Sequence, residues 1–179
     1  MTVMEELAPG DLARVQRFVN TANLESGSDE LGDPAALAAW LQDAGLAPAG
    51  ARFDEAGRER IVELREALRA LLLANHGEPP DRDAIATLDR AARLVVAFDA
   101  DGSARLAPAD DGVDGVIGEL LGIVVRAQAD GTWPRLKACP AEACGEAFYD
   151  RSRNRSRTWC TMSVCGNRAK ARSYRARQR

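Results

Sequence analysis

The sequence predicts a mainly α-helical N-terminal domain with a small β-hairpin, followed by a small C-terminal module built around four cysteines. Three observations indicate this division. Apolar residues recur at helical spacing through most of residues 8–129, one short stretch inside them is β-rich, and all four cysteines fall within 27 residues. We therefore expect two domains, at residues 1–134 and 135–179, with the boundary near Trp133.

Helical periodicity and capping residues predict five helices in the first domain. They cover residues 8–24, 33–45, 54–75, 81–92 and 110–130; the second begins at Asp33-Pro34, which suits a helix N-terminus. Residues 25–32 are expected to form a loop. Residues 94–98 and 104–107 flank the turn signal Asp101-Gly102 and predict a β-hairpin.

The same periodicity predicts which side chains face inward. In the first helix Leu12, Val15, Val19 and Ala22 should share the buried face, and in the fourth helix Ile85 should point inward. In the helix over residues 54–75, three arginines are expected on the polar side: Arg58, Arg65 and Arg69.

Charge divides unevenly between the two parts. Residues 135–179 hold 12 of the 24 Lys+Arg and only 3 of the 27 Asp+Glu, a net charge of +9. Residues 1–134 therefore hold 12 basic and 24 acidic residues, a net charge of −12. This asymmetry indicates that the C-terminal part meets an anionic partner. The alternative is that the acidic body and the basic tail neutralise each other.

Several classes of protein are disfavoured. The chain is 46% hydrophobic without a run of about 18 apolar residues, so no membrane helix is expected. Acidic residues stand near the N-terminus where a signal peptide would carry Lys or Arg, which predicts a cytoplasmic protein. No P-loop, dinucleotide-binding fingerprint or nucleophile elbow occurs, so we expect no catalytic residues and no enzyme.

The four cysteines follow the pattern C-x4-C-x15-C-x4-C, from Cys139 and Cys144 to Cys160 and Cys165. Two close pairs at this separation are typical of a structural zinc site. Four thiolates would leave no open position on the metal, so one structural Zn²⁺ is predicted. Two disulfides are the alternative, which a cytoplasmic location disfavours, and four unrelated free thiols are the other.

Basic residues surround the second cysteine pair. Between the pairs, arginine alternates with Ser, Asn and Thr, which suits phosphate recognition: Arg151, Arg153, Arg155 and Arg157. After Cys165 a basic helix is predicted, with Ser163 as its candidate cap. Its cations are Arg168, Lys170, Arg172, Arg175, Arg177 and Arg179. So many like charges on one helix need an anion, and nucleic acid is the expected one.

A second site is conceivable in the first domain. Asn20 and Thr21 could line a small-molecule pocket with Arg65 as the partner of an anion. The alternative, which we favour, is that Asn20 and Thr21 cap a helix end and that Arg65 makes a surface or interdomain contact.

Cys165-Gly166-Asn167-Arg168, with Trp159-Cys160 before it, resembles the CGNR zinc finger. The first domain resembles that finger's usual partner, the ABATE domain of bacterial stress-induced transcription regulators, in the segments 18–21, 37–41 and 64–68. The resemblance implies a treble-clef-like finger of zinc knuckle, β-hairpin and helix that binds DNA. It also implies a regulatory or ligand-sensing N-terminal domain. Because a single finger rarely gives much sequence specificity, a homodimer formed through the first domain is a separate expectation.

These expectations give one leading hypothesis and three rivals. The leading one is a DNA-binding transcription regulator, nucleoid-associated when bound, with an unidentified small-molecule effector. The first rival is RNA binding, for which aromatic side chains would have to stack on bases. The second is a basic tail that docks on an acidic protein surface, and the third is a ligand-binding or enzymatic N-terminal domain.

Overall fold

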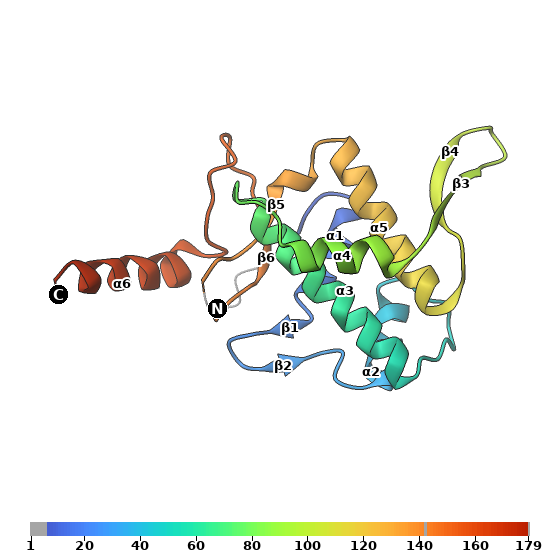
Figure 1. The fold of residues 1–179 in the computed structure, drawn as a ribbon, viewed down its shortest axis with the longest axis horizontal. Coiled ribbons are helices and arrows are strands. Elements are labelled where there is room, and N and C mark those ends of the chain that lie inside the picture. Colours follow the sequence, from blue (N-terminus) through green and yellow to red (C-terminus); the bar gives the residue numbers. More distant parts are fainter. Residues whose placement is uncertain (1–6, 142, 179) are drawn as a thin grey trace.

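The helices of the N-terminal part pack around a central helix. A basic helix projects from one end of the molecule, and a β-hairpin projects from the other end (Figure 1). The computed structural model describes residues 7–141 and 143–178. Its helices are α1 (Leu12–Val19), α2 (Pro34–Asp43), α3 (Glu55–Ala74), α4 (Arg82–Ala91), α5 (Gly112–Ala129), the short η1 (Trp133–Arg135) and η2 (Met162–Gly166), and α6 (Asn167–Arg177).

The described strands form three separate antiparallel pairs. They are β1 (Ala22–Asn23) with β2 (Ser28–Asp29), β3 (Leu94–Phe98) with β4 (Ala104–Pro108), and β5 (Leu136–Ala138) with β6 (Ala147–Tyr149). The fold class predicted from the sequence is confirmed: a mainly helical region with small hairpins, then a four-cysteine cluster with a hairpin and a helix.

Aspartates begin three of the helices as predicted. Asp33 accepts hydrogen bonds from the backbone N–H groups of Ala35 and Ala36, at 2.9 and 2.8 Å. Asp54 and Asp81 cap α3 and α4 in the same way. Each cap satisfies an N–H group that the first helical turn leaves without a partner. At the other end of α2, Gly45 adopts the left-handed φ of +67° that stops the helix.

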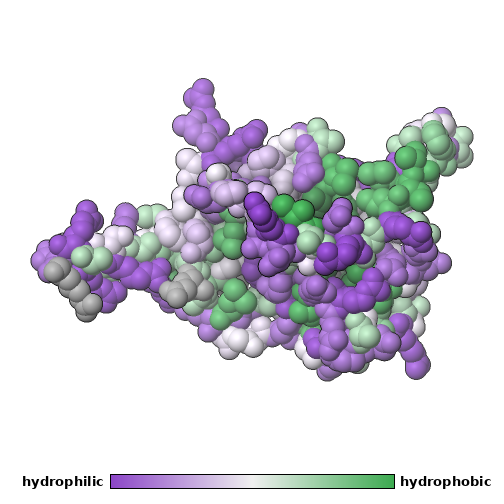
Figure 2. Space-filling view, viewed as in Figure 1, coloured by the Kyte–Doolittle hydropathy of each residue, from purple (hydrophilic) through white to green (hydrophobic). Residues whose placement is uncertain are grey.

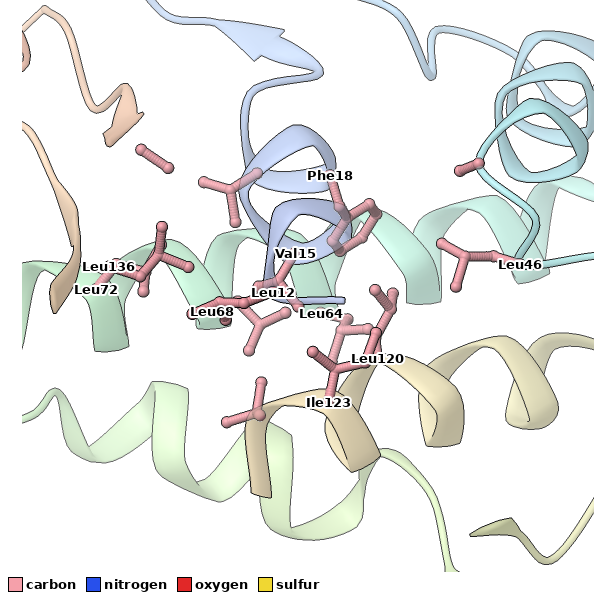
Figure 3. Close-up of a cluster of buried hydrophobic side chains, with 14 of the residues drawn as sticks. Leu12, Val15, Phe18, Leu46, Leu64, Leu68, Leu72, Leu120, Ile123 and Leu136 are labelled. Carbon is pink, nitrogen blue, oxygen red and sulfur yellow. The ribbon is translucent and has the colours of Figure 1, made fainter. Parts of the chain in front are cut away.

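The core forms where α1, α3 and α5 meet, and Figure 3 shows their side chains converging between the helices. Leu136 of β5 enters the same core, so the strand before the first cysteine is part of the packing of the N-terminal helices. Removal of such side chains from water supplies most of the folding free energy. No described helix combines the length and the apolar character that crossing a membrane requires.

Some details of the sequence prediction were wrong. α1 ends at Val19, so Ala22 lies in β1 and not on the helix, and residues 25–32 include β2 instead of being all loop. Ile85 is 45% exposed and therefore does not face the core. Arg65 and Arg69 are buried, at 3% and 5% exposure, and not on a solvated face of α3.

Arg65 is buried because polar partners meet its guanidinium group inside the protein. Its Nη1 and Nη2 donate to the two carboxylate oxygens of Asp29, at 2.7 and 2.8 Å, and Nη1 also donates to Thr21 Oγ1 at 3.1 Å. The hydrogen bonds from Arg65 lower the pKa of Asp29, which keeps the carboxylate ionised. This ion pair ties the β1–β2 hairpin to α3.

Replacing Asp29 by Ala should therefore destabilise the protein by about 2–3 kcal/mol, because a buried guanidinium loses its main counter-charge. Urea unfolding measures this change. The matched control is Asp43→Ala, which removes an Arg–Asp pair whose side chains are 44% and 77% exposed and should cost less than about 0.5 kcal/mol. Equal effects of the two substitutions would contradict this account of Arg65.

Candidate metal centre and basic surface

The four cysteines lie on two short turns that the backbone brings together. Cys139 directly follows β5, and Cys144 stands in the tight turn before β6. The Cys139 N–H donates to the Glu146 carbonyl at 2.9 Å, and Gly145 supplies a φ of +62° that completes the turn. Cys160 precedes η2, and Cys165 lies within it, so one wide helical turn presents the second pair.

The four sulfur atoms all lie within 4.8 Å of one another. Cys160 Sγ is 3.5 Å from Cys144 Sγ and 3.7 Å from Cys165 Sγ. Sulfurs bound tetrahedrally at Zn–S distances of about 2.3 Å stand about 3.8 Å apart, so this spacing suits zinc. The cluster therefore fits one structural zinc ion with four thiolate ligands.

The electrostatics of the cluster also favour a cation. Hydrogen bonding with Cys144 and Cys160 lowers the pKa of Cys139 to about 2, whereas the contact with Cys139 raises the pKa of Cys144 to about 12. The contact with Cys139 also raises the pKa of Cys160, and burial raises that of Cys165. Four thiolates this close together would repel one another, and a bound divalent cation would stabilise all four.

A small apolar cluster supports the cysteine site. Phe148 of β6 is 4% exposed and packs with the cysteines, and the partly buried Trp159 packs against the same cluster. The Arg157 guanidinium lies 4.7 Å from the centre of the Phe148 ring. Arg157 also donates to the carbonyls of Trp159 and Cys160, which holds the second cysteine pair against the first.

Side chains of α1 and α3 hold the backbone of the cysteine turns. The side chain of Asn20 forms two hydrogen bonds with Ala147: Nδ2 donates to its carbonyl at 3.0 Å, and Oδ1 accepts from its N–H at 2.7 Å. Buried Arg69 donates to the carbonyl of Gly145 at 2.6 Å and to that of Val19 at 2.7 Å. Through these two hydrogen bonds, Asn20 joins β6 to the C-terminal end of α1.

The C-terminal end of α3 makes a second set of contacts, with η1 and with β5, the strand before the first cysteine. Asn75 Nδ2 donates to the carbonyls of Trp133 and Leu136, at 3.0 and 2.7 Å. The Nε2 atom of His76 is 2.8 Å from the carbonyl oxygen of Ala138. Neither residue was predicted to contact the finger, because nothing in the pattern of a helix end reveals a partner some 60 residues away.

Two family models match this chain. One, the CGNR zinc finger, matches residues 135–178. The other, ABATE, described as "putative stress-induced transcription regulator", matches residues 12–136, well over half of the chain. This chain belongs to the ABATE family. No curated protein matches it.

The two family matches confirm the resemblance that the sequence motifs indicated. Together with the clustered sulfurs, they make the C-terminal part a CGNR zinc finger with a four-cysteine site for one structural zinc. The ABATE region and the CGNR finger meet at β5, where Leu136 is buried in the main core.

The arginines of the loop between the cysteine pairs differ in their contacts. Arg153 and Arg155 are exposed, and no described acidic residue pairs with them. Arg151 donates to the Leu7 carbonyl at 2.8 Å and Arg157 is held by the turn beside the cysteines. Beneath the surface of this loop, the buried side chains of Lys137 and Asp150 form an ion pair at 2.9 Å.

Asp150 stays ionised in this buried position. Burial tends to raise its pKa, but hydrogen bonds from Ser152 and Lys137 outweigh that effect and lower the pKa to about 2. Lys137 Nζ also donates to the carbonyls of Arg155 and Arg157, at 2.6 and 3.2 Å. The loop therefore has a defined shape that turns Arg153 and Arg155 towards solvent.

Helix α6 follows the last cysteine without a break and has no buried residue. Arg168 forms an ion pair with Glu25 at 2.8 Å, whereas Lys170 and Arg172 pair with no acidic group in the described part of the chain. Arg175 and Arg177 contact only carbonyls of their own helix there. Ser163 does not cap the helix, because it lies inside η2 and its carbonyl accepts from Asn167. Arg179 lies outside the described residues.

The residues suggested for a ligand pocket do not form one together. Asn20 lines an open cleft of about 250 Å³ together with Ala22, Asn23, Glu25, Cys144 and Glu146. Thr21 and Arg65 are not among the lining residues, because Arg65 is paired with Asp29. Thr21 Oγ1 instead donates to the Phe18 carbonyl at 2.8 Å, at the end of α1.

Replacing Cys165 by Ser should abolish stoichiometric zinc binding, since three thiolates and a hydroxyl bind zinc far more weakly than four thiolates. Zinc content per chain, measured by inductively coupled plasma mass spectrometry, should fall from about one to near zero. The matched control is Ser163→Ala, on an exposed residue of the same turn, which should keep its zinc. Retention of zinc by the Cys165 variant would exclude the four-cysteine site.

Proposed function

We propose that this ABATE-family protein is a DNA-binding transcription regulator, in which residues 135–179 contact the DNA and residues 1–134 regulate that binding. The family description is that of a transcription regulator, and the chain contains a zinc finger. The observation that supports DNA contact most directly is α6: a helix with five cations, no acidic residue and no buried face.

The surface of α6 suits a polyanion better than a protein core. Figure 2 shows the helix as a mainly hydrophilic projection at the left end of the molecule. Like charges one helical turn apart, such as Arg172 and Arg175, repel each other unless an anion neutralises them. Regularly spaced phosphates on DNA provide such an anion, and an exposed helix is of the right width for the major groove.

The loop between the cysteine pairs provides a second group of cations. We propose that Arg153 and Arg155 contact phosphates directly, because both are exposed and lack acidic partners in the described part of the chain. Arg151 and Arg157, which hydrogen-bond to backbone carbonyls, position that loop. The loop and α6 are both joined directly to zinc-binding cysteines, so the metal site would hold both sets of DNA contacts in place.

Recognition of single-stranded RNA is less well supported. Base stacking needs exposed aromatic side chains. In the finger, Phe148 and Tyr149 are buried, and Trp159 packs beside the cysteines. Tyr174 on α6 is 62% exposed, and a single exposed ring offers little stacking surface. Duplex DNA is therefore the better candidate.

We also propose that the cleft beside Asn20 receives a small-molecule effector. Its walls belong to the β1–β2 region and to the turn that carries Cys144, so a bound molecule would contact both parts of the chain. Glu25 lies in the same cleft and pairs with Arg168 at the start of α6. A ligand that competes for Glu25 would release Arg168 and alter the basic helix.

Anisotropy of labelled duplex DNA, titrated with zinc-loaded protein over a salt series, tests the proposal. With about six to eight phosphate contacts, log affinity should fall with log salt at a slope near −5 to −7. Replacing Arg153 and Arg155 by Ala should make the slope about 2 units shallower.

One control variant and two contrary outcomes make this experiment decisive. Arg82→Ala with Arg90→Ala removes two exposed arginines from α4, outside the finger, and should leave the slope unchanged. Absence of binding at low salt by folded, zinc-loaded protein would rule out direct DNA binding. Tighter binding of single-stranded RNA than of duplex DNA would favour the alternative.

A further inference from the structure

The β3–β4 hairpin projects from the body at the end of the molecule opposite to α6 (Figure 1). Three of its apolar residues are exposed: Val95, Val96 and Phe98, at 46%, 61% and 72%. Figure 2 shows this region as a hydrophobic projection at the upper right. An isolated two-stranded hairpin is marginally stable in water, and an exposed apolar surface of this kind usually marks an interaction site.

One face of the hairpin carries no polar side chain. The paired residues along it are Leu94 with Pro108, Val96 with Leu106, and Phe98 with Ala104, and paired residues of an antiparallel sheet share a face. Nothing in the described part of the chain covers Val96 or Phe98. The proposed DNA contacts do not involve this surface, so it is independent of them.

Strand β3 also has a free edge. Among the described residues it pairs only with β4, and the sequence Leu94–Phe98 contains no charge or proline that would protect an exposed edge. The outer edge of β4 is different, because Pro108 has no N–H and packs on α5 at Gly118. The available edge is therefore that of β3.

The hydrogen bonds within the hairpin show which groups face this edge. Ala109 N–H donates to the Arg93 carbonyl at 3.0 Å, and Asp99 N–H donates to the Ser103 carbonyl at 2.9 Å. Odd-numbered residues of β3 thus direct their backbone groups towards β4. Because the direction alternates along a strand, the N–H and C=O groups of Leu94, Val96 and Phe98 point outwards.

We propose that the protein forms a two-fold symmetric homodimer in which the β3 strands of two copies pair antiparallel, centred on Val96. In this register Val96 faces Val96 of the second copy and Leu94 faces its Phe98, so the outward backbone groups pair with one another. The two hairpins become one four-stranded sheet with a continuous apolar face.

Charge complementarity supports a second copy as the partner. The same register places Arg93 opposite Asp99 of the other chain, once on each side of the two-fold axis. Within one chain, Arg93 and Asp99 already form exposed ion pairs. Arg93, whose side chain is 82% exposed, lies 3.4 Å from Asp110, and Asp99 pairs with Arg105. Such pairs cost little to rearrange. The dimer would keep the two zinc fingers clear of the interface, since α6 lies at the other end of each chain (Figure 1).

Sedimentation equilibrium of full-length, zinc-loaded protein without DNA tests the proposal, and its result does not depend on DNA binding. The wild-type protein should be dimeric. Val96→Asp, at a residue that is already exposed, places two like charges at the axis and should weaken the dimer at least about tenfold. The matched control Val125→Asp, on the exposed side of α5, should leave the dimer intact.

A charge exchange tests the register. Arg93→Asp alone should weaken the dimer, and Arg93→Asp combined with Asp99→Arg should restore it. Thermal unfolding confirms that each variant is folded. A wild-type protein that stays monomeric up to high concentration overturns the proposal, as does a dimer that resists both Val96→Asp and Arg93→Asp.

Discussion

The structure of the finger depends on the hydrogen bonds by which α1 and α3 hold the backbone of the first cysteine turn. Asn20 pairs with Ala147 through both atoms of its amide, Arg69 donates to Gly145, and His76 lies against Ala138. These contacts are buried or partly buried, where a hydrogen bond that is lost is not replaced by water. They fix two of the four metal-binding sulfurs relative to the N-terminal core.

The remaining features of the finger follow from that attachment. Zinc would join the second cysteine pair to the first, and Arg157 binds the same junction through the Phe148 ring and nearby carbonyls. Helix α6 continues from Cys165, so its direction is set by the metal site and, through it, by the N-terminal helices. A change in the cleft at Asn20 and Glu25 could therefore reach the basic helix over a short path.

Local signals predicted much of this fold and part of the site. The cysteine spacing, the capping aspartates and the Asp101-Gly102 turn act over a few residues, and each was interpreted correctly. The burial of Arg65 could not be predicted, because its counter-charge Asp29 is 36 residues away. The role of Asn20 was missed for the same reason: its partner Ala147 is 127 residues away, and helical periodicity says nothing about such contacts.

Amide hydrogen exchange of the full-length protein, measured by mass spectrometry with zinc bound and after chelation, tests the central claim most directly. If the cysteine turns and the N-terminal helices form one structure, removing zinc should speed exchange in residues 136–150 and also at the C-terminal ends of α1 and α3, where Asn20 and His76 make their contacts. Exchange in α2, which is remote from the finger, should not change. Faster exchange in the finger alone, with α1 and α3 unaffected, would contradict the claim.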